Sequence, residues 1–522
     1  MLNYWWVTRP KRKLDSVPEI LSTIAENALD QEWSGERGSH LEFEDALEDA
    51  GLKREGDRRD HTGGGGRTYM AWIESLGLVF KQEGTGKIKL TLAGEAIMNG
   101  DSPVAVLTGQ VLKYQFPSAF SVSRGVNVAE RFRIRPFRYI LRLLNDSRIH
   151  FLTQDELAKI VITEAENESD ACHEHVVARI LAYREDGDKV LPKNFAEMYT
   201  SSKGTVDYEK PFSHLLDIAN TIFNWIEYTQ LARREDKKLY ILEGRERDVQ
   251  TILSSTPPFI DRPHQHEFYQ RKYGIDPKHR KDTRNLSGSF IVTSFMVQEQ
   301  KIKKAFVIQS LRKPISGITT SLIDAIAEDT GIAGKTVEEV LQKNYPHGAI
   351  GSFMTEYFEM AFKGRDEATE FEIATRTIFE ETFGFKARHV GPIGLTPDVL
   401  LLSDNAGYQA IIDNKAYSKY SISNDHRNRM VHNYLRNLHN YSTSNLPLVF
   451  FSYIAGGFSE KINEQLTSIY NEAGIAGSAI NVLNMIRLIE NQVNSPYSHQ
   501  GIRQLFSMNR QILLTDIQKS DG

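Results

Sequence analysis

Residues 366–453 constrain the fold most, because a helical pattern there gives way to short, continuous apolar runs. Apolar residues recur at helical spacing before Gly384, which is expected to end the helix. That apolar face carries Phe371, Ala374, Ile378, Phe379 and Phe383. Buried strands are predicted at 396–402, 408–415 and 447–453, with a turn at 403–407 and a polar helix at 425–441. This order of helix, two hairpin strands, helix and strand predicts an α/β domain around a central mixed sheet.

Three side chains that suit catalysis stand on the predicted hairpin, namely Asp398, Asp413 and Lys415. Asp413 and Lys415 are two apart on one strand, so they share a face, whereas Asn414 points the other way. Asp398 enters the neighbouring strand and is expected to lie close to both. Two carboxylates can hold Mg²⁺, which polarises a phosphoryl oxygen and lowers the pKa of a bound water. The lysine can orient that water or stabilise the charge that develops on the phosphate.

The pattern Pro397-Asp398 followed by Asp413-Asn414-Lys415 is that of the PD-(D/E)XK nuclease superfamily. The pattern is short, and its structural alternative is a turn beside a surface ion pair. Its position favours the nuclease, because both halves lie at predicted buried strands behind an amphipathic helix that bears acids.

A longer stretch resembles the cleavage domain of the FokI-like type IIS restriction endonucleases. The matching pieces are Phe383-Gly384-Phe385, Pro397-Asp398 and Asp413-Asn414-Lys415-Ala416-Tyr417-Ser418. The Lys-Ala-Tyr-Ser extension makes this match more specific than the superfamily pattern alone. The resemblance covers roughly residues 365–455.

The resemblance implies a role for each matching residue. Asp398, Asp413 and Asn414 would contact the metal, and Lys415 would be the third catalytic member. The acid of the preceding helix corresponds best to Glu372, although Glu370 lies close by and could serve instead. The implied cofactor is Mg²⁺, for which Mn²⁺ can substitute.

Three partners follow from the same resemblance: double-stranded DNA, a second copy of the chain and a companion DNA methyltransferase. Cleavage would leave 5′-phosphate ends. The transient homodimer would form through the helix predicted at about 425–440. The loop before that helix is one residue shorter than in the family, and the residues at the family's interface positions differ.

The overall charge excludes a uniformly basic DNA-binding coat, since 63 Lys and Arg stand against 68 Asp and Glu. A basic segment is nevertheless present from Arg262 to Lys313, with 12 basic residues and four acids. Such a segment is typical of a surface that a phosphate backbone passes, and a solvated basic face is the alternative. The predicted DNA contacts are Arg9, Lys11, Arg12, Lys13, Arg67, Arg271, Lys272, Arg280, Lys281 and Arg284.

Residues 67–100 predict a helix, stopped by Gly77, and a hairpin of strands 78–81 and 87–92, which is a winged-helix pattern. Similar units are predicted at 152–162, which opens with a Thr153–Glu156 capping box, and at 215–244. The alternative is a plain helical domain with incidental hairpins. The start WWVTRP and residues 112–118 resemble, more diffusely, the recognition regions of the AlwI-like group of type IIS enzymes.

Two N-terminal motifs have a structural as well as a functional interpretation. The glycine tract Gly63–Gly66 lacks the Gly-Lys-Ser/Thr ending of a phosphate-binding loop, so a surface loop is expected. Trp5 and Trp6 could stack on DNA, or they could begin a core or a docking strand.

The single cysteine excludes an intrachain disulfide and a four-cysteine zinc site. Cys172, His173 and His175 resemble a metal cluster, but histidines two apart on a helix diverge. A surface helix is therefore expected there.

These patterns predict an α+β multidomain chain. The expected parts are a winged-helix-like recognition subdomain at 1–118, a second recognition region at 119–256, a basic connector at 257–330 and a PD-(D/E)XK nuclease domain at 331–522. The expected function is type IIS-like restriction, in which a short duplex sequence is recognised and the backbone is hydrolysed nearby. A non-catalytic DNA-binding regulator and a strand-specific nickase stay open as alternatives. No signal peptide and no apolar run of membrane-spanning length is found, so a prokaryotic cytoplasmic protein without a membrane partner is expected.

Overall fold

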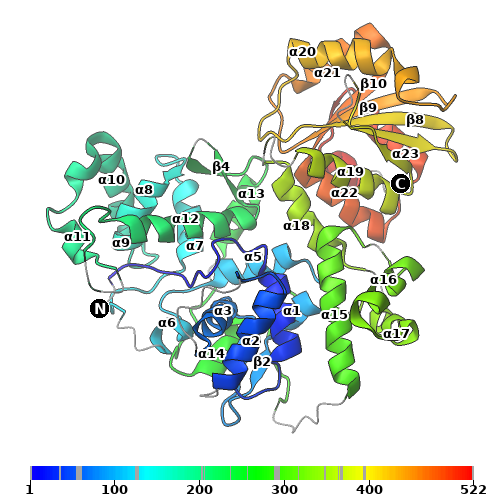
Figure 1. The fold of residues 1–522 in the computed structure, drawn as a ribbon. Coiled ribbons are helices and arrows are strands. Elements are labelled where there is room, and N and C mark those ends of the chain that lie inside the picture. The colour runs from blue at the N-terminus through cyan, green and yellow to red at the C-terminus, as the bar shows by residue number, and fades with distance from the viewer. Residues whose placement is uncertain are drawn as a thin grey trace. The chain divides into compact units, whose positions relative to one another are not determined.

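The computed structural model divides into two compact units, residues 1–307 and residues 308–522 (Figure 1). The structure describes residues 3–33, 37–54, 62–123, 128–201, 204, 206–235, 237–255, 257–286, 294–315, 317–345, 348–362, 364, 368–391 and 396–519. Within these ranges no helix is long and apolar enough to cross a membrane. The finer domain boundaries expected from the sequence stay predictions.

Helices and short hairpins make up the first unit. Its elements are α1 (Val17–Asn27), α2 (Arg37–Asp49), α3 (Gly64–Ser75), β1 (Val79–Lys81), β2 (Ile88–Leu90), α4 (Leu92–Met98), α5 (Pro103–Lys113), α6 (Ala119–Ser123), α7 (Pro136–Leu144), β3 (Leu152–Thr153), α8 (Gln154–Glu156), the π-helix η1 (Leu157–Val161), α9 (Ile162–Glu164), α10 (Asp170–Asp186), the 3₁₀-helix η2 (Gly187–Val190), α11 (Phe195–Met198), α12 (Ser213–Tyr228), β4 (Ala232–Glu235), β5 (Lys238–Ile241), α13 (Glu246–Ser254) and α14 (His266–Tyr273). Helix α15 (Ser294–Arg312) runs across the division between the units.

One hydrophobic core extends through the first unit and includes three buried tryptophans. Trp225 of α12 stacks on Phe137 of α7, with ring centroids 5.6 Å apart, and Trp72 of α3 is fully buried. Trp5 is only 1% exposed, and its Nε1 donates to the carbonyl of Ala165 at 2.8 Å. Trp5 therefore docks the N-terminal segment on the core and is not available to stack on DNA.

The helix and hairpin predicted at 67–100 are present as α3, β1 and β2, followed by α4. Val79 pairs with Leu90 in the antiparallel hairpin. Gly77, which follows α3, has φ +70°, and a Cβ there would meet the ring of Tyr273 at 2.5 Å. The later predicted hairpin is β4–β5, to which β3 adds a third strand. The predicted capping box of Thr153 and the N3 glutamate is confirmed in α8.

The second unit combines a sheet with helices. Its elements are α16 (Thr320–Thr330), α17 (Gly334–Asn344), α18 (Ile350–Met360), α19 (Ala368–Glu381), β6 (Lys386–His389), β7 (Val399–Ser403), β8 (Tyr408–Asn414), α20 (Asn424–Asn428), the π-helix η4 (Arg429–Leu435), the 3₁₀-helix η5 (Leu438–Asn440), β9 (Leu448–Ala455), α21 (Ile462–Ala473), β10 (Ala476–Asn481), α22 (Val482–Asn494), α23 (His499–Phe506), β11 (Arg510–Gln511) and α24 (Leu514–Lys519).

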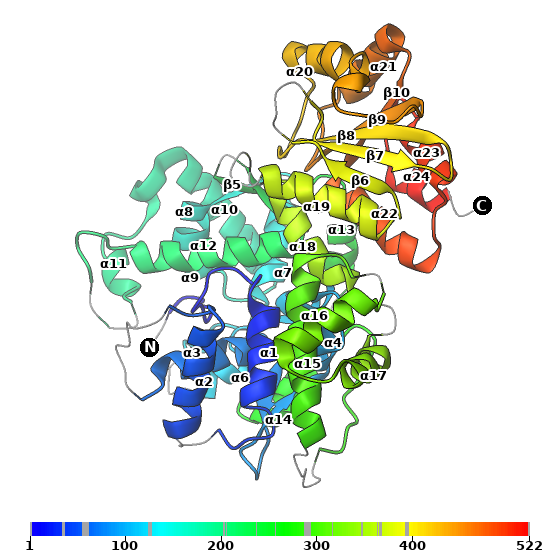
Figure 2. The same cartoon turned by 45° about the vertical axis from the view of Figure 1, so that its right-hand side comes forward.

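Six strands form one mixed sheet in the order β11-β10-β9-β8-β7-β6. The pairs β6–β7 and β7–β8 are antiparallel, whereas the pairs β8–β9, β9–β10 and β10–β11 are parallel. Helices α19, α22 and α23 lie on one face of this sheet, and α20 and α21 lie on the other (Figures 1 and 2). The mixed sheet expected from the sequence is confirmed, and every residue of its central strand β8 is buried.

The single polar helix expected at 425–441 is wrong in its length and regularity. The segment is a short α-helix, a π-helix and a separate 3₁₀ turn. Side chains end the helix early, because Nδ2 of Asn437 donates to the carbonyl of His432 at 2.6 Å and the hydroxyl of Tyr441 donates to the carbonyl of Tyr434 at 2.6 Å. The sequence pattern also missed β6, an edge strand whose residues Lys386–His389 include no apolar run.

Candidate active site

The register of β7 and β8 brings Asp398 and Asp413 together. Val399 faces Ile412 across the antiparallel pair, so the residue before Val399 lies beside the residue after Ile412. The main-chain N–H of Asn414 donates to Oδ2 of Asp398 at 2.6 Å. Both carboxylates therefore stand at the edge of the sheet where β7 begins and β8 ends.

Lys415 follows β8 directly and contacts this pair of aspartates. Its Nζ lies 2.6 Å from Oδ2 of Asp413 and donates to the carbonyl of Asn414 at 3.1 Å. Its main-chain N–H donates to the carbonyl of Ile454 on β9, which fixes the backbone beyond the end of β8. Burial acts to lower the pKa of Lys415, but the charges of Asp413 and Asp398 outweigh it and raise the pKa, so the ammonium stays protonated.

The two aspartates repel each other in a buried site. Burial and the neighbouring charge of Asp413 raise the pKa of Asp398 well above its ordinary value, and Lys415 opposes this only in part. Oδ1 of Asp413 is buried and has no hydrogen-bond partner among the described residues. An unpartnered carboxylate oxygen next to a second carboxylate is a donor set that a hard divalent cation would satisfy.

The side chain of Asn414 points away from the aspartates, as strand alternation predicts. Its Nδ2 donates to Oγ1 of Thr375 on α19 at 2.6 Å, and that hydroxyl lies 3.0 Å from the hydroxyl of Tyr357 on α18. Asn414 can therefore offer a cation its main-chain carbonyl, while its side chain is engaged with the helix. No group of three His, Cys, Asp or Glu side chains that could hold a metal occurs within the described ranges, so a cation here would also need main-chain oxygen or water.

Glu372 lies on α19, the helix beneath this edge of the sheet. Its carboxylate contacts Nε2 of His389 at 2.8 Å, and its charge contributes to the raised pKa of Asp398. Glu370, the alternative, is an exposed residue in the first turn of the same helix. Sequence reasoning missed His389, because it lies on the polar edge strand β6, which carried no strand signal.

Sequence reasoning also missed an aromatic layer behind Lys415. The hydroxyl of Tyr420 lies 2.8 Å from Nδ1 of His426, and its ring is 5.5 Å from that of Tyr453 on β9. Burial and the positive charge of Lys415 lower the pKa of His426. The closeness of these rings arises from the fold of residues 416–430 and has no periodic signal in the sequence.

The basic residues predicted near the N-terminus differ in their surroundings. Arg12 pairs with Asp217 at 2.8 Å, and burial lowers the pKa of Arg9. Lys13 is exposed, whereas Lys11 is partly buried. Arg67, a fifth predicted contact, donates a hydrogen bond from Nη2 to the hydroxyl of Thr62, five residues before it. Their role in DNA binding stays a prediction.

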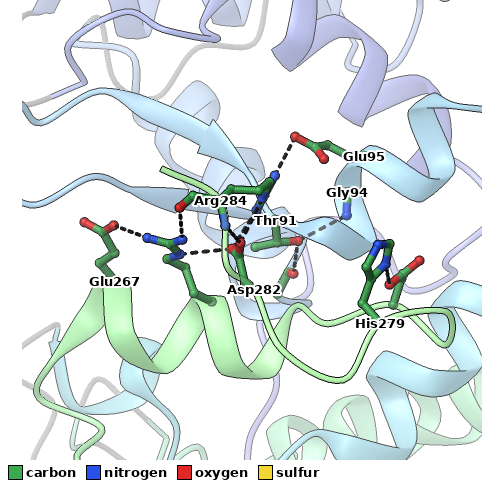
Figure 3. A network of polar contacts seen from close by, with 10 residues as sticks. Thr91, Gly94, Glu95, Glu267, His279, Asp282 and Arg284 are labelled. Carbon is green, nitrogen blue, oxygen red and sulfur yellow. Dashed lines mark hydrogen bonds and ion pairs between the residues drawn. The ribbon is translucent and has the colours of Figure 1, made fainter. Parts of the chain in front are cut away.

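The basic residues of the predicted connector separate into two kinds. Arg271 and Arg284 both contact Asp282, whose side chain is 2% exposed, and Arg284 also contacts Glu95 of α4 (Figure 3). Lys272, Arg280 and Lys281 are exposed instead and form no ion pair with another described residue. The first kind fixes the fold of residues 271–284, and the second kind faces solvent.

The histidines beside Cys172 do not form a metal site among the residues that the structure describes. Nε2 of His173 contacts Asp146 at 3.0 Å, and Nε2 of His175 contacts Glu164 at 2.9 Å. The two rings thus bind different acids, as expected for residues two apart on α10.

Comparisons with known proteins divide the chain at residue 330. Residues 331–513 match the family model described as FokI, cleavage domain, and residues 74–330 match the model described as AlwI restriction endonuclease. The type II restriction enzyme StsI of Streptococcus sanguinis is 28% identical over 149 residues, which cover 26% of this chain and 24% of StsI. The chain therefore matches about a quarter of the length of that relative.

Two solved structures align over long ranges with low scores. The restriction endonuclease FokI covers 98% of this chain and 100% of its own, at 14% identity and a TM-score of 0.28. The BpuJ1 endonuclease binding domain, solved in complex with pyrene- and phenanthrene-modified DNA, covers 52% of this chain and 96% of its own, at 15% identity and a TM-score of 0.37. The two family models are adjacent and together span residues 74–513. Residues 74–330 are thus similar to AlwI restriction endonuclease and residues 331–513 to the FokI cleavage domain, and together these matches support a type IIS restriction endonuclease.

Proposed function

We propose that this protein recognises a short sequence in double-stranded DNA and hydrolyses the backbone a short distance away, leaving 5′-phosphate ends. One observation carries the proposal: Asp398, Asp413 and Lys415 converge at one edge of the sheet, inside the region that matches the FokI cleavage-domain model. A domain kept only for pairing or folding has no need of two buried, mutually repelling carboxylates.

The charge arrangement at this edge suits hydrolysis of a phosphodiester. Lys415 is held by Asp413 and by the carbonyl of Asn414, so its ammonium can stand beside a phosphate whose negative charge grows in the transition state. The N–H of Asn414 holds Asp398 in position before the substrate arrives. Glu372, through its charge and its contact with His389, is proposed as a positioning residue.

Mg²⁺ fits the donors that the site offers. Asp398, Asp413 and the main-chain carbonyl of Asn414 would hold it, since Oδ1 of Asp413 is buried and has no hydrogen-bond partner among the described residues. When bound, the ion would polarise a phosphoryl oxygen and lower the pKa of a coordinated water. Mn²⁺ is expected to substitute because it takes the same oxygen ligands.

The first unit is proposed to read the DNA sequence, and its helix–hairpin segments α3–β1–β2 and α12–β4–β5 are proposed as winged-helix elements. Cutting both strands requires two active sites, so a transient homodimer of the second unit on DNA is proposed. A companion DNA methyltransferase would protect the host sequence. The proposed setting is the prokaryotic cytoplasm.

Digestion of supercoiled plasmid tests the activity. The wild-type protein with Mg²⁺ should yield defined linear fragments, and run-off sequencing would give the recognition site and the offset together. Asp413→Asn and Lys415→Ala should each reduce the cleavage rate by about 10²- to 10³-fold or more, because each removes a charge at the reacting phosphate. Chelation of the metal should abolish cleavage.

Two exposed residues near the same hairpin serve as matched controls. Asp404 is an exposed residue of the turn between β7 and β8, and Lys419 is exposed a few residues after the site. Asp404→Asn and Lys419→Ala should cleave like the wild type. Full cutting by Asp413→Asn would contradict the assignment of the site. Open circles without linear product would instead identify a nickase, and sequence-specific binding without cleavage under Mg²⁺ or Mn²⁺ would identify a regulator.

A further inference from the structure

The first unit contains a cavity of about 1140 Å³. Its walls come from α5, from the end of α13 with residues 257–260, and from α14 with the segment 275–282. Seven lysine and arginine side chains line it against four carboxylates. Such an excess of positive charge around a hollow favours an anionic ligand, provided that the charges are not already paired within the protein.

The carboxylates of this cavity are largely neutralised by internal partners. Glu267 contacts Arg271 in the next turn of α14, and Asp282 receives hydrogen bonds from both Arg271 and Arg284 (Figure 3). Asp276 contacts Nδ1 of His279. Three of the four acids are thus occupied, so they oppose an incoming anion only weakly.

Four of the seven cations have structural tasks. Arg135 forms a pair with Glu168, and Arg138 donates to the carbonyls of Leu253 and Ser255. Lys113 donates to the carbonyl of Tyr273, the last residue of α14, at 3.0 Å and to the carbonyl of Ile275 at 2.6 Å. The fourth is Arg271, which pairs with Glu267 and Asp282 as described above. All four side chains are part of the cavity wall.

The remaining three cations, Lys272, Arg280 and Lys281, are exposed and have no ion pair with another described residue. Phe268 stands beside them, 36% exposed, with Nζ of Lys272 located 4.5 Å from the centre of its ring. This combination suits a nucleic acid: the cations can contact the phosphates, and the exposed ring can pack against a sugar or a base.

The segment that presents these cations is held in a fixed shape. Asp282 accepts the main-chain N–H and the guanidinium of Arg284, and Nη2 of Arg271 donates to the carbonyl of Arg284 at 2.6 Å. Arg284 also reaches Glu95 on α4, whose first turn is capped by Thr91 (Figure 3). The loop is therefore tied to α14 and to α4 before DNA binds, which limits the entropy lost on binding.

We propose that the rim of this cavity binds the phosphate backbone of duplex DNA through Lys272, Arg280 and Lys281, with Phe268 packed against the sugar–phosphate edge. This inference rests on the proposed function, because it assigns the surface by which the recognition unit holds its substrate. The contacts are to phosphates, so they should strengthen binding to every sequence equally and carry little sequence preference.

The test uses the full chain with Asp413→Asn, so that DNA is bound and not cut. The probe is a fluorescent 30-base-pair duplex of arbitrary sequence, titrated at several KCl concentrations between about 50 and 200 mM. Replacement of Lys272, Arg280 and Lys281 by alanine should weaken binding about 10- to 100-fold at low salt. It should also reduce the slope of log K against log [KCl] by up to about 3, since each phosphate contact contributes about 0.9.

A charge-matched control removes three exposed cations elsewhere in the first unit, namely Lys193, Lys210 and Arg247. This control should keep most of the slope of the parent protein. An unchanged slope in the cavity variant, or an equal loss in the control, would overturn the inference. Neither result would affect the proposed nuclease function, because cleavage of plasmid by the otherwise wild-type chain tests that separately. Thermal unfolding of both triple variants should match that of the parent, since none of the replaced side chains forms an ion pair with a described residue.

Discussion

The two units each bury carboxylates beside cations, and the two clusters are completed in opposite ways. In the first unit, Asp282 accepts hydrogen bonds on both oxygens from Arg271 and Arg284. Burial opposes ionisation of Asp282, but these hydrogen bonds outweigh it and lower the pKa. In the second unit, burial and Asp413 raise the pKa of Asp398, and one oxygen of Asp413 has no partner among the described residues.

This difference separates a structural ion pair from the cluster that is proposed to be catalytic. The Asp282 cluster has a cation for each carboxylate oxygen, so nothing further is needed to stabilise it. The Asp398–Asp413 cluster has two carboxylates for one lysine, so it gains from an additional cation. Chemically similar groups therefore hold a loop in one unit and are left incompletely neutralised in the other.

The largest expected effect comes from removing one of the two repelling carboxylates. Asp398→Asn should reduce DNA cleavage by about 10²- to 10³-fold or more. Without metal, the same variant should be no less stable than the wild type, because the amide oxygen can still accept the N–H of Asn414 while the repulsion is gone. Urea unfolding in EDTA measures this.

Added Mg²⁺ sharpens the same prediction. The melting temperature of the wild type should rise with Mg²⁺, since a ligand that binds only the folded state stabilises it, and that of Asp398→Asn should rise less. A variant destabilised in EDTA would show that Asp398 serves the fold, as Asp282 does.

The opposite outcome is expected at the structural cluster. Asp282→Ala leaves two arginines without their shared partner and should lower the free energy of unfolding by about 2–4 kcal/mol. The control is Asp261→Ala, which removes an exposed partner of Arg133 and should cost less than about 0.5 kcal/mol. Equal effects in urea unfolding would remove the distinction between the two clusters.

The acid on α19 should have an intermediate effect on catalysis. Glu372→Gln should lower the cleavage rate about 10- to 100-fold, because Glu372 acts on the site through its charge and through His389. Glu370→Gln on the exposed side of the helix should leave the rate unchanged. A larger loss from Glu370→Gln would reassign the positioning role to that residue.

The smallest expected effect is a pH dependence of stability at the cavity wall. Burial lowers the pKa of Lys113 to about 8, although Asp276 opposes the shift. Lysine in an unfolded chain has a pKa of about 10.4. Between pH 8 and that value the unfolded state binds more protons than the folded state, so the free energy of unfolding rises with pH. The free energy of unfolding of the wild type, compared with Lys113→Met, should increase by about 1–2 kcal/mol from pH 8 to pH 10. A difference independent of pH would contradict this.

Local pattern was enough to predict the elements that carry the candidate site. The two hairpin strands and the strand that became β9 have strong apolar runs, and alternation along a strand puts Asp413 and Lys415 on one face. The opposite direction of the Asn414 side chain follows from the same rule. Their proposed chemical roles stay predictions, whereas their proximity is a property of the structure.

Contacts between residues far apart in the sequence could not be predicted from the local sequence pattern. A count of charges treats Arg284 and Lys281 alike, but Arg284 meets Glu95, which lies 189 residues away, and Lys281 meets no described acid. The contact of Glu372 with His389 joins a helix to an edge strand that had no apolar signal. Periodicity reports which face of an element is buried and gives no information on which partner it finds there.

The hydrogen bonds of Asn414 make the geometry of the candidate site depend on two helices. The Tyr357 and Thr375 hydroxyls lie in series with the Asn414 side chain, while the N–H of the same residue holds Asp398. A shift of either hydroxyl would therefore turn the peptide that aims the carboxylate. Hydrogen bonds from α18 and α19 thus help to set the direction of the Asp398 side chain, through Asn414.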